Sequence, residues 1–340
     1  MSEVISRISK VEIKALWKRF DLTWDLQSDV NILSGINGSG KSTILDCIAA
    51  LLSIGTMPKE LENLAQSVKV TFDNGKYISF EHIKDTIKNL EQGAETSGTL
   101  KNAITNIKEI EGSNYKSIKV VSFSITSLDD LGITLVELRN LIKINIISTF
   151  DNVIPEIGSR PDENVRTELD RYIFQLQKKY LDYQLNIGKK AFEIVSQNNG
   201  HSQEDVLQIR KQQERFLEII DNLFKDTDKK VNRKKNEIIF LSGSDEITAY
   251  QLSSGEKQIL VILLTVLVQD NKPSIIFMDE PEISLHFDWQ KKLIQYIREI
   301  NPNVQIILAT HSPAVIIEGW RDKVFNVSDL IKNDRIKPKE

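Results

Sequence analysis

Hydrophobic and polar positions along the chain follow two periods, one typical of strands and one typical of helices. Short apolar runs rich in β-branched residues predict strands within the segments 11–17, 30–35, 117–126, 143–149, 237–242, 274–282 and 304–310. Residues 67–81 alternate around Asn74-Gly75, a dipeptide that favours a tight hairpin turn. Apolar spacing predicts helices at 41–55, ending at Gly55, and near 287–299.

The middle of the chain changes to a helical period. From 162 to 196 the apolar residues recur at steps of three and four, which predicts an amphipathic helix about 50 Å long. The pattern breaks at 197–201, and Ser202 with Asp205 is typical of the start of a second helix. The pair predicts either an antiparallel hairpin or two packed helices of a globular lobe.

Strands that alternate with helices, and that are apolar along their whole length, predict a buried parallel sheet and an α/β fold. The apolar run 259–268 is too short for a membrane span of roughly 20 residues, so we expect a buried helix. The N-terminus lacks the apolar core of a signal peptide.

Length, cysteine content and net charge limit the classes of protein that this chain can belong to. The 340 residues suffice for one large domain or two smaller ones, and Cys47, the single cysteine, excludes a disulfide framework within the chain. We therefore expect a cytoplasmic protein that does not bind membranes. Because the net charge is −4, nucleic-acid binding would need a local basic patch.

A glycine-rich loop carries the first chemical signal. Residues 35–43, GINGSGKST, fit the phosphate-loop pattern G-x-x-x-x-G-K-[ST] between a predicted strand and a predicted helix. Backbone amides of such a loop surround phosphates, its lysine contacts the terminal phosphates, and its serine binds Mg²⁺. We expect ATP and Mg²⁺ to be bound by Asn37, Gly38, Ser39, Gly40, Lys41, Ser42 and Thr43.

Two later strands end in polar residues that suit phosphate chemistry. The strand within 274–282 ends in Asp279-Glu280, and the strand within 304–310 is followed by His311. An acid in the position of Asp279 can hold Mg²⁺, and an acid in the position of Glu280 can deprotonate the attacking water. We expect Lys41, Glu280 and His311 to be catalytic and Ser42 and Asp279 to bind the metal.

The order of these motifs, together with LSSGE at 252–256, is similar to that of the ABC ATPase superfamily. The resemblance implies a P-loop NTPase fold: an ABC-ATPase head with a mixed β-sheet and an inserted helical hairpin or lobe. It places the head at 1–155 and 237–340 and the insertion at 156–236. The segment EISLHFDWQ, residues 282–290, occupies the position of the D-loop.

The resemblance also implies a role for LSSGE. In ABC ATPases this signature turn contacts the γ-phosphate of ATP bound to a facing subunit. Ser253, Ser254, Gly255 and Glu256 would therefore bind the nucleotide of a second copy, with the Ser253 hydroxyl and the Gly255 amide as donors. Two ATP molecules would lie between two chains in a head-to-tail homodimer, and higher oligomers could build on that dimer.

The long helical insertion resembles the SMC/RecF branch, and the segments at 279–290 and 309–316 are similar to those of OLD-family ATPases and their Septu and PARIS anti-phage relatives. The short stretch after His311 leaves no room for the Toprim nuclease domain of OLD proteins. We therefore expect the sensor or regulatory ATPase of a defence system whose effector is a separate chain, expected to be a nuclease. The alternatives are a RecF-like or SMC-like ATPase that clamps DNA and a scaffold that scarcely hydrolyses ATP.

Three assignments stay open at this stage. The glutamine expected after a strand is replaced in ISTFDN, 147–152, by Thr149 or Asp151. Trp17 and Phe20 are candidates for stacking on adenine, or are core residues. The basic run KKVNRKK, 229–235, either binds DNA or RNA phosphates or forms a solvated helix face.

Overall fold

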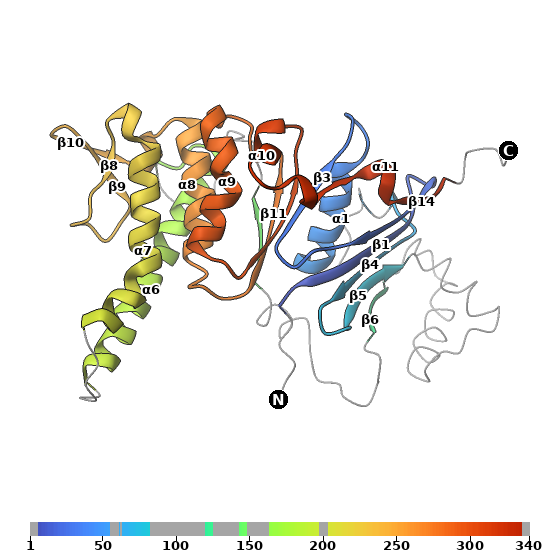
Figure 1. Cartoon of the computed structure of the whole chain (residues 1–340), viewed down its shortest axis with the longest axis horizontal. Helices are drawn as coiled ribbons and strands as arrows, with labels where there is room; N and C mark the ends of the chain where they lie inside the picture. The colour runs from blue at the N-terminus through green and yellow to red at the C-terminus, as the bar shows by residue number, and fades with distance from the viewer. Residues whose placement is uncertain are drawn as a thin grey trace. The chain divides into compact units, whose positions relative to one another are not determined.

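The computed structural model describes residues 6–54, 61, 63–81, 120–124, 143–147, 163–196 and 203–334 (Figure 1). The chain forms two units. Unit 1 consists of residues 1–28, 33–144 and 325–340, and unit 2 of residues 29–32 and 145–324. None of the described helices is long and apolar enough to cross a membrane.

Unit 1 is built on an antiparallel sheet with the strand order β14-β2-β1-β4-β5-β6. Its strands are β1 (Ile8–Leu16), β2 (Phe20–Asp25), β4 (Ser67–Phe72), β5 (Tyr77–Glu81), β6 (Val120–Ser124) and β14 (Ile331–Asp334). Val70 lies opposite Ile78, so the hairpin predicted around Asn74-Gly75 is confirmed. Helix α1 (Lys41–Ile54) packs on β4 and β5, and α11 (Val327–Leu330) precedes β14.

A second sheet has the strand order β13-β3-β12-β11-β7. It contains β3 (Val30–Ser34), β7 (Lys143–Ile147), β11 (Ser274–Asp279), β12 (Val304–Ala309) and β13 (Val324–Asn326). β11 and β12 are parallel, and their side chains are buried almost throughout, as the continuous apolar runs predict. Because both strands run in one direction, their carboxyl ends, with Asp279 and Ala309, lie at the same edge.

Helices of unit 2 cover this parallel pair. α8 (Ser254–Leu267) and α9 (Phe287–Ile300) stand beside β11 in Figure 1, and α10 (Pro313–Ile317) packs on α9. Twelve consecutive residues of α8, from Glu256 to Leu267, are buried, which confirms the buried helix predicted from the apolar run 259–268. Short 3₁₀ turns span Lys225–Thr227, Ala249–Gln251 and Arg321–Lys323.

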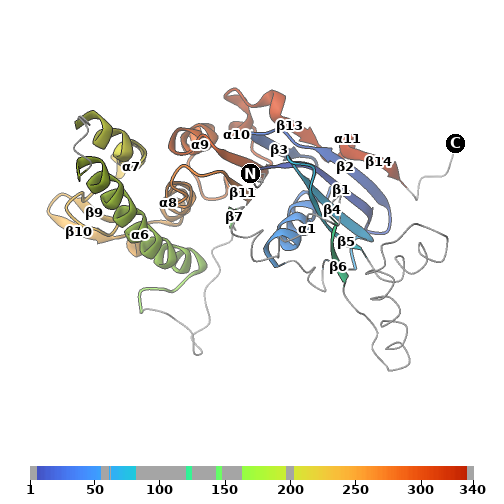
Figure 2. The ribbon, with the colours of Figure 1, turned by 90° about the horizontal axis from the view of Figure 1, so that it is seen from below.

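The predicted insertion supplies α6 (Glu168–Ser196) and α7 (Gln203–Leu223) to unit 2. They form a hairpin whose base packs on α8 and α9, while its far end extends beyond them (Figures 1 and 2). The hairpin and the packed lobe predicted as alternatives therefore describe different parts of one structure. The expected helix cap at Ser202 and the helix end at Gly55 lie outside the described residues.

The first helix of the hairpin begins later than the sequence predicts, at Glu168 rather than at 162. The Thr167 hydroxyl accepts a hydrogen bond from the Asp170 amide, and the Asp170 carboxylate accepts from the amides of Arg166 and Thr167. This arrangement caps the helix at Thr167. Beyond α7, a small antiparallel sheet contains β8 (Lys230–Val231), β9 (Ile239–Ser242) and β10 (Asp245–Thr248).

Candidate nucleotide-binding and signature residues

The predicted phosphate loop connects β3 to α1. Gly38 and Gly40 have φ angles of 76° and 99°, a region that side-chain-bearing residues rarely adopt, so glycine is required there. The Lys41 side chain is only 4% exposed, and its ammonium donates to the carbonyl oxygens of Gly35 (3.2 Å) and Ile36 (3.3 Å). The lysine is therefore folded across its own loop, at the N-terminus of α1.

Trp17 packs against this loop. A Cβ atom added to Gly40 would lie 2.2 Å from Cη2 of Trp17, so only a glycine fits beneath the indole. Phe20 meets Trp17 edge to face with ring centroids 6.1 Å apart, and the Arg19 guanidinium lies 4.5 Å from the centre of the Phe20 ring. Of the two aromatic candidates, Trp17 is thus the one that contacts the phosphate loop, and Phe20 supports it.

The acidic pair and the histidine belong to unit 2 and are brought together there. Glu280 follows β11, and its amide donates to the Ala309 carbonyl at the end of β12 (2.8 Å). His311 Nε2 lies 3.6 Å from Glu280 Oε1. Glu280 has a φ angle of 48°, a strained value for a residue with a side chain and one that often occurs at functional sites. Two of the three predicted catalytic residues are therefore neighbours.

Asp279 offers an oxygen that suits a cation. One carboxylate oxygen, Oδ1, is buried and has no hydrogen-bond partner among the described residues. A buried carboxylate oxygen without a donor is costly unless a cation or water satisfies it. The donor set also fits Mg²⁺, which prefers oxygen ligands and retains several waters. No cluster of three acidic, histidine or cysteine side chains suited to a metal occurs in the described part of the chain.

Glu282, which the motifs do not mark as a site residue, joins this region together. Glu282 is 9% exposed and accepts hydrogen bonds from the Thr310 hydroxyl and from the amides of His311 and Ser312, both at 3.1 Å. It ties the segment after β11 to the backbone that carries His311. Gln290 adds a second tie, because it accepts from the Ser312 hydroxyl and donates to the Leu285 carbonyl.

The signature turn is the N-terminal cap of α8. The Ser253 hydroxyl donates to the Glu256 carboxylate (2.9 Å) and accepts from the Glu256 amide (3.4 Å), while that carboxylate accepts from the Ser253 amide. These are the bonds of a capping box. Ser253 and Ser254 remain exposed. A Cβ on Gly255 would lie 2.3 Å from the Ser284 carbonyl oxygen, so glycine allows the D-loop backbone to pass.

Glu256 has internal partners that favour a positioning role over direct contact with a nucleotide. Its side chain is almost wholly buried, and its carboxylate accepts from the Lys229 ammonium (2.8 Å) and the Thr227 hydroxyl (2.9 Å) as well as from Ser253. Burial by itself would raise the pKa of this carboxyl, but the hydrogen bonds from Lys229, Ser253 and Thr227 outweigh burial and lower the pKa. Glu256 is therefore ionised at neutral pH.

The next residue makes a second buried ion pair. Lys257 Nζ lies 2.7 Å from Asp170 Oδ1 at the start of α6, and both side chains are nearly buried. Glu256 meanwhile binds Lys229 and Thr227, which follow α7. Two consecutive residues of α8 thus fasten both legs of the hairpin to the signature turn.

The basic run at 229–235 is not a solvated helix face, because it forms β8 and the turn after it. Several of its cations have carboxylate partners: Lys229 with Glu256, Arg233 with Asp221 (2.7 Å) and Lys235 with Glu246 (3.4 Å). These partners lie on α8, α7 and β10, so the run contributes less free positive charge than its sequence suggests.

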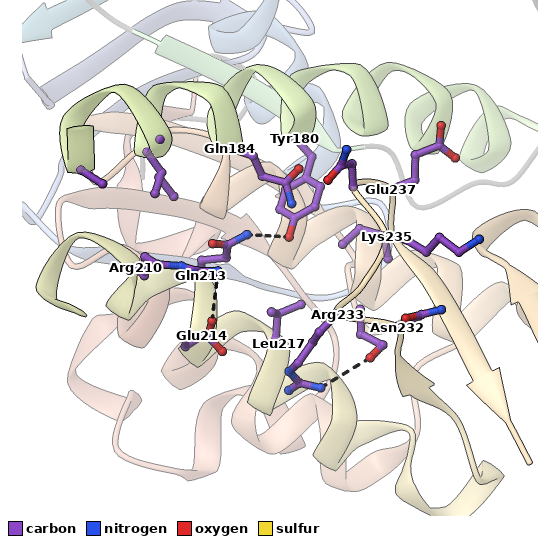
Figure 3. Close-up of a pocket in the computed structure, with 16 residues that line it drawn as sticks. Tyr180, Gln184, Arg210, Gln213, Glu214, Leu217, Asn232, Arg233, Lys235 and Glu237 are labelled. Atoms are coloured by element: carbon purple, nitrogen blue, oxygen red, sulfur yellow. Dashed lines mark hydrogen bonds and ion pairs between the residues drawn. The ribbon is translucent and has the colours of Figure 1, made fainter. Parts of the chain in front are cut away.

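A cavity of about 370 Å³ opens beside this turn, between α6 and α7 (Figure 3). Tyr180 on α6 and Gln213 on α7 meet across it, with the Gln213 amide donating to the Tyr180 hydroxyl at 2.9 Å. Arg233 and Lys235 reach its rim from the turn. None of the predicted site residues lines this cavity.

A family model described as "AAA domain, putative AbiEii toxin, Type IV TA system" matches residues 30–318. The chain belongs to this family. The Septu protein PtuA of Bacillus thuringiensis is 26% identical over 333 residues, which cover 91% of this chain and 72% of PtuA. The "Retron Vc95 probable ATPase" of Vibrio cholerae serotype O1 biovar El Tor is 26% identical over 194 residues, 53% of this chain. The chain spans only 37% of that retron protein.

Among solved structures, an SMC head bound to the C-terminal winged-helix domain of ScpA matches with a TM-score of 0.53 and 16% identity. The match covers 92% of this chain and 91% of the SMC head. The chain therefore has the α/β fold of an ABC-type ATPase head, as predicted.

Proposed function

We propose that this chain is a nucleotide-dependent ATPase of an anti-phage defence system. The observation that carries the ATPase assignment is the proximity of Glu280 and His311, 3.6 Å apart, where two parallel buried strands end. The defence assignment is supported by the similarity to PtuA and to the retron ATPase.

Each site residue would have a distinct task. Amides of 37–43 and the Lys41 ammonium would bind the phosphates of ATP, the lysine leaving the loop carbonyls that it now contacts. Ser42 and Asp279 would hold Mg²⁺, which neutralises phosphate charge when bound. Glu280 would accept the proton of the attacking water, and His311 would donate a hydrogen bond to the terminal phosphate.

The signature turn would serve a second copy of the chain. Ser253 and Ser254 are exposed at the N-terminus of α8, which is the positive end of a helix dipole. Because the Glu256 carboxylate is held by Lys229 and Thr227, it fixes the turn without opposing an incoming phosphate at close range. We propose a head-to-tail homodimer in which Ser253 and Gly255 contact the γ-phosphate of ATP on the partner.

Replacing Glu280 with Gln tests this proposal. Since the amide cannot accept the water proton, we expect ATP hydrolysis to fall at least about 100-fold while ATP binding persists. The variant should accumulate as an ATP-bound dimer, measured by light scattering with bound nucleotide. Glu318→Gln, an exposed carboxylate in the same unit, is the matched control. A Glu280→Gln variant that neither retains ATP nor dimerises would contradict the sandwich.

The effector is proposed to be a separate protein, expected to be a nuclease. The prediction is that the purified chain alone does not cleave DNA with Mg²⁺ present, and that it forms a stable complex with the product of an adjacent reading frame. Metal-dependent cleavage by the chain itself would overturn this part of the proposal.

The alternative of a RecF-like or SMC-like DNA clamp makes a different prediction. Neutralising the basic side chains of 229–235 should then abolish salt-sensitive, ATP-dependent binding to duplex DNA. The carboxylate partners of Lys229, Arg233 and Lys235 argue for the defence ATPase over the clamp.

A further inference from the structure

Helix α6 carries two series of positions with heptad spacing. One series is buried in unit 2: Leu169, Ile173, Leu176, Tyr180, Tyr183 and Ile187. The other alternates the same steps of three and four and is defined here as the outer seam: Lys178, Leu181, Leu185, Gly188, Phe192 and Val195. With 3.6 residues per turn, the centres of the two series lie about 130° apart around the helix. The outer seam therefore faces away from α8.

Three apolar side chains of the outer seam are largely exposed. Leu185, Phe192 and Val195 are 64%, 74% and 66% exposed. Gly188 lies at the edge of the cavity between α6 and α7, and a Cβ added to it would meet nothing within 4 Å. Single exposed apolar residues are ordinary on protein surfaces, but an aligned row at heptad spacing is typical of a helix that packs on another helix.

We propose that the outer seam binds the outer seam of a second copy of this chain, with the two α6 helices antiparallel. Setting Leu185 opposite Gly188 of the second copy also sets Leu181 opposite Phe192 and Lys178 opposite Val195. Each contact occurs twice because the arrangement has twofold symmetry. Large side chains then meet small or medium ones, and Gly188 admits the Leu185 side chain without overlap.

The charges that flank the seam select this partner and this direction. In the same register Asp182 lies beside Lys189 of the second copy, and Lys189 beside Asp182. Both side chains are exposed, and no ion pair joins either one to another described residue. A parallel pairing would instead place Lys178 against Lys178, a like-charge contact within the seam. A self-complementary pattern of this kind favours a second copy over an unrelated helix.

This contact differs from the proposed ATP sandwich, because it involves the hairpin and no nucleotide-binding residue. The full chain should therefore self-associate in the absence of nucleotide, in a concentration-dependent way that sedimentation velocity can measure.

The first test is Phe192→Asp, which places a charge within the seam. We expect nucleotide-free association to weaken at least about tenfold. The matched control is Leu207→Asp, because Leu207 is 66% exposed on α7 of the same hairpin and lies outside the seam. The control should associate like the wild type. A wild-type chain that is monomeric at 100 times the concentration used for ATPase assays, or equal weakening by both variants, would overturn the proposal.

The second test separates the antiparallel register from other pairings. Asp182→Lys and Lys189→Asp should each weaken association about threefold or more, since each creates two like-charge contacts. The double variant, which exchanges the two charges, should restore association to the wild-type level. Failure of the double variant to recover would overturn the register. The ATP-dependent dimer of Glu280→Gln is measured separately. The proposed seam contact and the proposed ATP sandwich are therefore tested independently.

Discussion

The phosphate loop and the signature turn are two polar turns that each open a helix, yet they are prepared for phosphate in different ways. The phosphate loop contains a cation. The Lys41 ammonium donates to two carbonyl oxygens at 3.2 and 3.3 Å, and a phosphate can replace these long contacts. The signature turn contains an anion, the Glu256 carboxylate, whose hydrogen bonds from Lys229, Thr227 and Ser253 are 2.8–3.0 Å long and partly buried. In the proposed function the first region would supply charge, and the second would supply hydroxyl and amide donors from a turn that Glu256 holds in place.

The largest expected effect is on the affinity for ATP, which we compare for one substitution in each turn. Lys41→Met removes a charged donor, so the affinity of the chain for ATP should fall about 100-fold. Ser253→Ala should change that affinity less than about threefold if the turn serves a second copy as proposed, yet it should lower hydrolysis. Calorimetry at concentrations below self-association measures both affinities. Equal losses would show that both turns serve one nucleotide.

Among the residues of the signature turn, Glu256 should contribute most to the free energy of unfolding. Glu256→Gln leaves Lys229 nearly buried without its partner, which should lower the free energy of unfolding by about 3 kcal/mol. Glu246→Gln, which alters an exposed pair with Lys235, is the control and should cost less than about 1 kcal/mol.

The same substitution has a pH dependence with a definite sign. Because the pKa of Glu256 is lowered from its ordinary value of 4.5, the stabilisation by its carboxylate is complete above pH 4.5. It is lost as the pH falls through the lower pKa of the folded protein. Denaturant unfolding of wild type and Glu256→Gln should therefore differ fully at pH 7 and converge below pH 4.5. A constant difference would contradict this assignment.

A smaller effect is expected where the signature turn meets the D-loop. Gly255→Ala places a methyl group 2.3 Å from the Ser284 carbonyl oxygen, so the backbone must move at a cost of about 1–3 kcal/mol. Ser254→Ala, at the exposed neighbouring position, should change stability by less than about 0.5 kcal/mol. Thermal unfolding of the two variants distinguishes a tight contact from a tolerant one.

The smallest effect concerns the aromatic neighbour of the phosphate loop. If Trp17 stacks on adenine, Trp17→Phe should weaken ATP binding about threefold to tenfold and remove the fluorescence change on binding. Trp320→Phe, in unit 2, should leave both unchanged. An unaltered fluorescence response in Trp17→Phe would assign this indole to packing on Gly40 alone.

The sequence predicts best where one physical pattern dominates. The alternation around Asn74-Gly75 and the continuous apolar runs of β11 and β12 specify strands through local chemistry. The apolar spacing predicts the start of α6 six residues too early, because Val165 is buried and continues that spacing although it precedes the helix. A buried loop residue and a buried helix residue look alike in sequence.

Some features of the site depend on tertiary contacts, so they cannot be predicted from the sequence. The motif order predicts Glu280 and His311, but Glu282 gains its role only from amides about 30 positions later. The basic run looks like a nucleic-acid patch until Asp221, Glu246 and Glu256 are placed beside it. The signature serines carried a second signal, the S-x-x-E capping box, which local rules alone would have revealed.

Two ion pairs connect the α6–α7 hairpin to α8 and thereby couple the hairpin to the signature turn. Asp170 joins the start of α6 to Lys257, and Lys229, which follows α7, pairs with Glu256. We therefore expect a tilt of the hairpin to move the turn that carries Ser253. Linkage then works in both directions: if engaging the far end of the hairpin changes the affinity for ATP by some factor, ATP must change the affinity at that end by the same factor. A contact many turns of helix away from the phosphates would thereby report on nucleotide state.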